Sequence, residues 1–173
     1  MPVKDILLLG NPVLRQKCSP VKRAHAEDIR GLIGDLRDTL QEFRRQRGFG
    51  RGIAAPQIGS TKQVVFVDFE YSGALINPRI VKRSTKKFTL WDDCFSFPDI
   101  LAYVVRNYGI TVSFQDEGGK SRKLSAEGAL SELLQHEIDH INGILAIDRA
   151  VDSRHIVLRS EFEKMSHKSQ LML

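Results

Sequence analysis

The chain has 173 residues, of which 42% are hydrophobic and 27% are charged, and its formal net charge is +5. A chain of this length and composition is typical of one globular unit with a core of its own, so we expect a single domain over residues 1–173. No apolar run approaches the roughly 20 residues that span a bilayer, and the run Ile6–Leu9 is too short for a secretory signal. These features exclude a membrane-spanning protein and favour a cytoplasmic one.

The first half of the chain predicts one helix followed by strands. Apolar residues recur at three- and four-residue spacing over residues 26–47, which is typical of an amphipathic helix, and Gly48 follows as its end. Alternating or short apolar runs then predict strands, at residues 63–70, 74–81, 84–90, 101–106 and 110–115. The Gly-rich residues 116–120 are typical of a hairpin turn.

The second half predicts another helix over residues 126–141, with Gly143 as its stop and one apolar stripe made by Leu130, Leu134, Ile138 and Ile141. From Val151 onward the chain favours a short third helix or a frayed tail. Helix, strands and helix in this order predict an α+β fold and not alternating βαβ units.

Basic residues cluster at 44–47, 82–87 and 120–123. Such clusters raise nonspecific affinity for RNA or acidic partners. No aromatic residues interleave with them as stacking platforms, so we interpret them as solvated faces. They favour at most a weak association with ribosomes, and no binding to DNA.

The segment from His136 to His140 reads HEIDH and falls on the second predicted helix. Two histidines at positions i and i+4 lie one helical turn apart, so both imidazoles can reach one ion, with Glu137 beside them as a base. This pattern also arises by chance on ordinary charged helices. Its position opposite an apolar stripe favours a metal site.

A hydrolytic metal needs a third protein ligand and an open position. Ala146 stands where a metzincin protease has its third histidine. A gluzincin-like protease would use Glu161 or Glu163, and Cys94 is another candidate. Spacing alone leaves these alternatives open.

Residues 50–59 place glycines and alanines around Gln57. Small residues let backbone approach a ligand, and the Gln57 amide can donate to a developing oxyanion. A tight turn before the next strand explains the same residues.

Taken together, GRGIAAPQIG at residues 50–59, QHEIDHINGIL at residues 135–145 and NPVLR at residues 11–15 resemble three motifs of the peptide deformylase family, in the family's order. The resemblance implies a deformylase-like α+β fold, with small antiparallel or mixed sheets around a central helix that carries HExxH. It also implies a metal-dependent amide hydrolase that removes the N-formyl group from N-formylmethionyl peptides of nascent proteins.

The resemblance assigns site residues as well. Cys94, His136 and His140 are expected to hold one divalent metal, with Fe(II) expected in the cell and Zn(II), Ni(II) or Co(II) as alternatives. Metal-activated hydroxide attacks the formyl carbon with Glu137 as general base, and Gln57 and the Phe95 N–H bind the oxyanion. The substrate is expected to lie against five residues: Arg51, Gly52, Ile53, Asp93 and Leu133. The pocket for the methionine side chain is expected to have apolar walls that include Phe95 and Leu133.

The middle motif departs from the family. It reads DDCFS at residues 92–96, where the family usually has EGCLS, and Leu101 stands where many members have an arginine. Two alternatives follow: a deformylase-like protein acting on another formamide or acyl-amide, or a formyl-peptide or ribosome binder with low turnover. We also expect Asp139 to pair with Arg106 and so fix the metal-bearing helix against a sheet.

Overall fold

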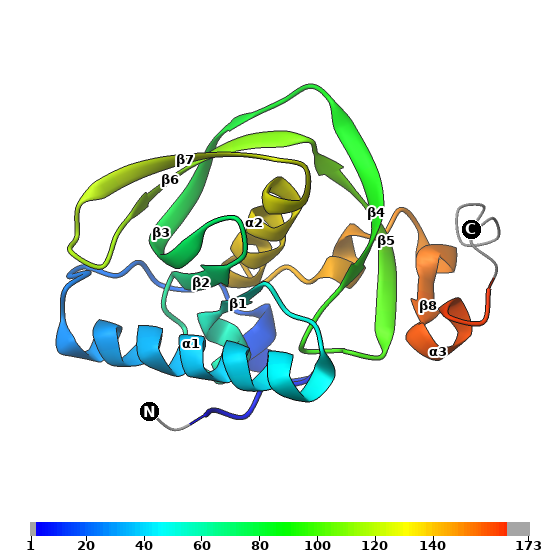
Figure 1. Ribbon diagram of the computed structural model, residues 1–173, viewed down its shortest axis with the longest axis horizontal. Coiled ribbons are helices and arrows are strands. Elements are labelled where there is room, and N and C mark those ends of the chain that lie inside the picture. Colours follow the sequence, from blue (N-terminus) through cyan, green and yellow to red (C-terminus); the bar gives the residue numbers. More distant parts are fainter. Residues whose placement is uncertain (1–2, 166–173) are drawn as a thin grey trace.

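The computed structural model describes residues 3–165 and has an α+β architecture (Figure 1), as expected. A five-stranded sheet has the order β1-β2-β3-β6-β7 and a three-stranded sheet the order β4-β5-β8, and all strand pairs in both are antiparallel. The strands are β1 (Gly52–Ala54), β2 (Val64–Asp68), β3 (Ser72–Arg83), β4 (Lys87–Asp93), β5 (Ile100–Asn107), β6 (Gly109–Gln115), β7 (Ser121–Glu127) and β8 (Ile156–Leu158).

Three α-helices complete the described fold, together with short 3-10 turns: α1 (Glu27–Arg47), α2 (Gly128–Ile141) and α3 (Arg159–Phe162). In Figure 1, α2 lies in the concave space under the arch of β3, β6 and β7, and the β4–β5 hairpin closes one side of that space. No helix among residues 3–165 is long and apolar enough to cross a membrane.

Helix α2 is buried on every side, because sheet residues and the amino-terminal part of the chain surround it. Its apolar stripe packs into the largest core cluster, as the sequence predicts. The polar side is buried as well, however, and this side carries the candidate site residues. The charged groups on this side of α2 therefore need partners within the protein.

Helix α1 follows the prediction closely. Its buried residues Ile29, Ile33, Leu36 and Leu40 form a second core with β1 and β2. Gly48 adopts a left-handed conformation at φ 77° and donates its N–H to the Arg44 carbonyl over 2.9 Å.

The sequence missed three strands, β1, β7 and β8, and misplaced one. The segment expected at residues 84–90 instead runs from Lys87 to Asp93, because Ser84 and Lys86 form the preceding turn through a 2.7 Å side-chain hydrogen bond. The expected third helix exists as the single turn α3, packed beside β8. The end of the predicted tail, residues 166–173, lies outside the described part of the chain.

Candidate metal centre

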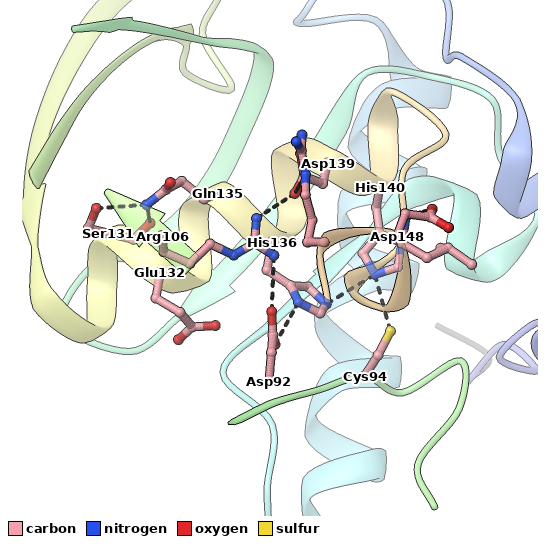
Figure 2. A network of polar contacts seen from close by, with 12 residues as sticks. Asp92, Cys94, Arg106, Ser131, Glu132, Gln135, His136, Asp139, His140 and Asp148 are labelled. Carbon is pink, nitrogen blue, oxygen red and sulfur yellow. Dashed lines mark hydrogen bonds and ion pairs between the residues drawn. The ribbon is translucent and has the colours of Figure 1, made fainter. Parts of the chain in front are cut away.

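Two elements bring three buried ligand side chains together. Cys94 directly follows β4, and His136 and His140 lie one turn apart on α2. The two Nε2 atoms are 3.1 Å apart, and the Cys94 Sγ lies 3.2 Å from the His140 Nε2 (Figure 2). Ligand atoms about 2.0–2.3 Å from a tetrahedral ion lie roughly 3.3–3.6 Å from each other. The three atoms therefore fit the coordination shell of one ion.

One buried polar atom beside the cluster supports the same interpretation. Within residues 3–165, the Glu137 Oε2 has no hydrogen-bond partner. Buried polar atoms are rarely left without a partner unless a ligand or solvent supplies one. Glu137 is therefore placed to act on a ligand bound at the three donor atoms.

A carboxylate orients the first histidine. Asp92 Oδ1 lies 2.9 Å from the His136 Nδ1, and Asp92 Oδ2 accepts a 3.0 Å hydrogen bond from Arg106. Burial opposes the ionisation of Asp92, but His136 and Arg106 outweigh it and lower the pKa of this carboxyl to about 2. An ionised Asp92 holds a proton on Nδ1 and so leaves the Nε2 lone pair for a metal.

The ion pair expected between Asp139 and Arg106 is confirmed. Arg106 Nη1 donates to Asp139 over 2.5 Å, and Arg149 binds the same carboxylate over 2.7 Å. Arg106 of β5 therefore contacts α2 through Asp139 and β4 through Asp92.

The position of the Glu137 side chain depends on Gly52, which lies directly against it. A Cβ at Gly52 would lie 3.0 Å from Glu137 Oε1 and 3.2 Å from Leu133 Cδ1. Burial raises the pKa of Glu137 to about 7. A carboxylate with this pKa suits general acid–base chemistry near neutral pH.

Both interpretations of residues 50–59, a tight turn and a donor to an oxyanion, fit the position of Gln57. It lies in a tight turn, where its Oε1 accepts a 2.9 Å hydrogen bond from the Ala54 N–H. This bond directs its Nε2 toward the cluster, 3.6 Å from Cys94 Sγ and 3.4 Å from Ser96 Oγ. The amide can therefore donate to an oxygen atom beside Cys94.

A cavity of about 450 Å³ opens beside the three donors. Its lining includes most of the residues that the sequence assigned to the site: Arg51, Gly52, Gln57, Asp93, Cys94, Phe95, Leu133, His136 and Glu137. His140 is buried and does not line the cavity.

The Ile53 side chain does not line the cavity, so its expected contact with a substrate stays a prediction for the backbone. Side chains alternate along a strand, so Gly52 faces the site while Ile53 packs into the core against α1. Only the Ile53 backbone remains for contact with a substrate.

The cavity wall is more polar than the sequence predicted. Phe95 and Leu133 do line the cavity, but Arg51 and Glu132 lie beside them as an ion pair of 2.7 Å. Glu132 could have been predicted, since it stands four residues before His136 on the same helix face.

Asp93 also has a charged partner that the sequence did not reveal. Arg159 binds Asp93 over 2.7 Å and lies over the Phe49 ring, with 4.9 Å between the guanidinium carbon and the ring centroid. Leu101 is buried, and it pairs with Asp93 across β4 and β5.

Two other ligand sets fit the structure less well. Asp92, Glu132 and His136 also place three donor atoms within 4.8 Å of one another, but arginines already neutralise both carboxylates. Among the described residues, neither Glu161 nor Glu163 joins a ligand cluster. The gluzincin-like alternative is therefore wrong.

The fold and the donor set define the class: an α+β protein whose Cys-His-His cluster and adjacent glutamate match a mononuclear metal-dependent hydrolase. The sequence profile of the family described as polypeptide deformylase matches residues 3–155. The chain belongs to this family.

Similar proteins support the assignment over nearly the whole chain. A peptide deformylase of Rhizobium meliloti is 40% identical over 86% of this chain and 85% of its own length. One from Halothermothrix orenii is 39% identical over 87% of this chain and 96% of its own.

Solved structures agree with these sequence relatives. The peptide deformylase of Thermotoga maritima superposes with a TM-score of 0.81 at 31% identity, covering 88% of this chain and all of the other. One from Synechococcus elongatus, solved in complex with actinonin, has a TM-score of 0.82 at 34% identity over 90% of this chain and 82% of its own.

Proposed function

We propose that this protein removes the formyl group from formylated amino-termini of peptides and releases formate. N-formylmethionyl peptides of nascent proteins are the substrate that membership of the family implies. The observation that carries the proposal is the convergence of Cys94, His136 and His140 beside a cavity that Glu137 and Gln57 also line.

In this proposal the three donors hold one divalent ion, which when bound polarises the formyl carbonyl and lowers the pKa of its water ligand to about 7. Glu137 accepts a proton through Oε2 and returns it to the leaving amine. The Gln57 amide and the Phe95 N–H stabilise the oxyanion, and losing one such donor costs about 2.7–4 kcal/mol of transition-state stabilisation.

A thiolate and two imidazoles suit Fe(II), Zn(II), Ni(II) and Co(II), and availability decides among such metals in cells. We propose Fe(II) as the resident metal, and we place the protein in the cytoplasm, where nascent peptides are made. A weak association with ribosomes through the basic clusters belongs to the same proposal.

The direct test is formate release from formyl-Met-Ala-Ser by protein reconstituted with Fe(II). We expect turnover by the native chain and a loss of at least roughly 100-fold in Glu137→Gln, with one metal per chain retained in both. Stoichiometric metal without formate release would instead favour a formyl-peptide binder.

One observation favours the alternative of a different formamide substrate: the Arg51–Glu132 ion pair in the cavity wall. Asp93 is a second difference, because the family usually has a glycine at this position of the middle motif. Its charge is paired with Arg159. Asp93→Gly tests whether this residue limits turnover of formyl-Met-Ala-Ser. An increase in kcat/KM for this peptide would show that Asp93 adapts the middle motif to a different substrate.

A further inference from the structure

An ion pair occupies part of the cavity wall where an apolar surface was expected. Glu132 Oε2 accepts a 2.7 Å hydrogen bond from Arg51 Nη2, and both side chains line the cavity. Glu132 lies one helical turn before His136, and Figure 2 shows its carboxylate on the same side of α2 as Asp92. The pair is therefore close to the reacting centre.

The Arg51–Glu132 pair belongs to the cavity wall and is not a contact between two exposed surface side chains. The Glu132 side chain is only 3% exposed, and that of Arg51 is 36% exposed. The Arg51 guanidinium also lies over the Phe69 ring, 5.3 Å from its centroid. Replacing a buried ion pair by packed apolar residues is often neutral or stabilising. Stability alone therefore does not account for charges at these two positions.

Hydrogen-bonding capacity remains free on both partners. Among the described residues, Glu132 Oε1 accepts no hydrogen bond, and Arg51 donates to Glu132 and, at 3.5 Å, to the Ala129 carbonyl. A guanidinium has five N–H donors, so donors remain for a ligand. The other arginine–carboxylate pairs that reach the cavity have one partner outside its wall: Asp92 with Arg106, Asp93 with Arg159 and Arg44 with Asp68.

We propose that the Arg51–Glu132 pair recognises the side chain of the first residue of the formylated substrate. It binds a side chain that ends in an amide at least as well as methionine, because the amide carbonyl accepts from Arg51 and the amide NH₂ donates to Glu132. The inference rests on the proposed function and names the substrate class within it. Methionine offers only a weakly accepting sulfur, so it would displace water from the pair without replacing its hydrogen bonds.

The test compares formyl-Gln-Ala-Ser with formyl-Met-Ala-Ser, whose first side chains have similar length, on the metal-loaded protein. We expect the ratio of kcat/KM values, glutamine over methionine, to be one or higher in the native chain. In Arg51→Met/Glu132→Met the ratio should fall by at least about 10-fold, as expected when a hydrogen-bonding pocket becomes apolar. The control Arg45→Met/Glu42→Met removes an ion pair on α1 outside the cavity lining and should leave the ratio unchanged.

A binding measurement separates this inference from the proposed function. Calorimetric titration of both peptides into metal-loaded Glu137→Gln, with and without the Arg51→Met/Glu132→Met change, reports preference without turnover. Binding that favours glutamine and loses this preference in the apolar variant supports the inference, even where formate is never released. Native protein that rejects the glutamine peptide by about 10-fold or more, or an apolar variant with an unchanged ratio in both assays, overturns it.

Discussion

At the scale of single residues, Gly52 determines how closely Glu137 can approach the cluster. A Cβ at this position would lie 3.0 Å from Glu137 Oε1, so alanine would push the carboxylate aside. A displacement of about 1 Å in a catalytic group can cost roughly 100-fold in rate. The glycine thus acts through the placement of the base.

The Glu137 carboxylate would have to move by a few tenths of an ångström, so we expect Gly52→Ala to lower kcat for formate release by up to about 100-fold while one metal per chain is retained. Gly31→Ala is the matched control, because it lies within α1 with no atom within 4 Å of its added Cβ. Full activity in Gly52→Ala would show that Glu137 does not need its present position.

Arg106 is the second decisive residue, because it neutralises Asp92 and Asp139 in a buried network. Arg106→Met removes one partner from each of two buried carboxylates, leaving Asp92 with His136 and Asp139 with Arg149, and should cost about 3–5 kcal/mol of unfolding free energy. Loss of Asp92 orientation should weaken metal binding by roughly 10–100-fold.

Urea denaturation and competitive metal titration measure these two effects. The control is Arg122→Met, whose ion pair with Asp116 is half exposed and should contribute at most about 1 kcal/mol. Unchanged stability and metal affinity in Arg106→Met would show that the network does not support the site.

At the scale of elements, the end of α2 depends on a glycine packed against another segment. Gly143 has φ 75°, and a Cβ there would lie 2.5 Å from the Arg15 carbonyl oxygen. Gly48, after α1, has φ 77° and open space around it. Both glycines avoid left-handed strain, but only Gly143 also avoids a clash with backbone.

Gly48→Ala should therefore cost about 1–2 kcal/mol of unfolding free energy, the price of left-handed backbone in alanine. Gly143→Ala should cost a further 1–3 kcal/mol or so, as in overpacked sites. Urea denaturation of both variants under identical conditions measures the difference. Equal costs would mean that η1 (Pro12–Arg15) moves away freely.

The elements also show how far sequence reasoning reaches. Helix periodicity predicted α1 and α2 within about two residues, and their spacing placed His136 and His140 together. Cys94 was identified as a ligand through the family resemblance, because spacing carries no signal for a partner 42 residues away in the chain.

The missed features have physical causes. β1 and β8 have three residues each, too few for a periodic pattern, and β7 alternates poorly because most of its residues are exposed. The partners of Asp93 and Glu132 come from segments remote in sequence, Arg159 and Arg51. Long-range ion pairs of this kind leave no local pattern.

At the scale of the whole molecule, both sheets and the helices α1 and α2 contribute residues to the cavity of the candidate site. We propose that residues 1–173 unfold as one domain, since Cys94 directly follows β4 and the two histidines lie on α2. Metal that binds only the folded chain should stabilise it, by about 2.7 kcal/mol at 100 times the dissociation constant.

Scanning calorimetry tests this with and without a chelator. We expect one transition in both conditions and a lower Tm after metal removal, while Cys94→Ala should show no Tm change on chelation. Two separate transitions would contradict a single domain.

The most direct test of the whole account is a Co(II) titration of the metal-free protein followed by near-ultraviolet absorption. Both cysteines are buried, and burial raises the pKa of Cys18 to about 11, so that thiol favours its protonated form. We predict one Co(II) per chain and a thiolate-to-metal band that Cys94→Ser abolishes and Cys18→Ser leaves unchanged, because only a thiolate is a metal ligand. A band that survives Cys94→Ser would contradict the assignment of this cysteine as the third ligand.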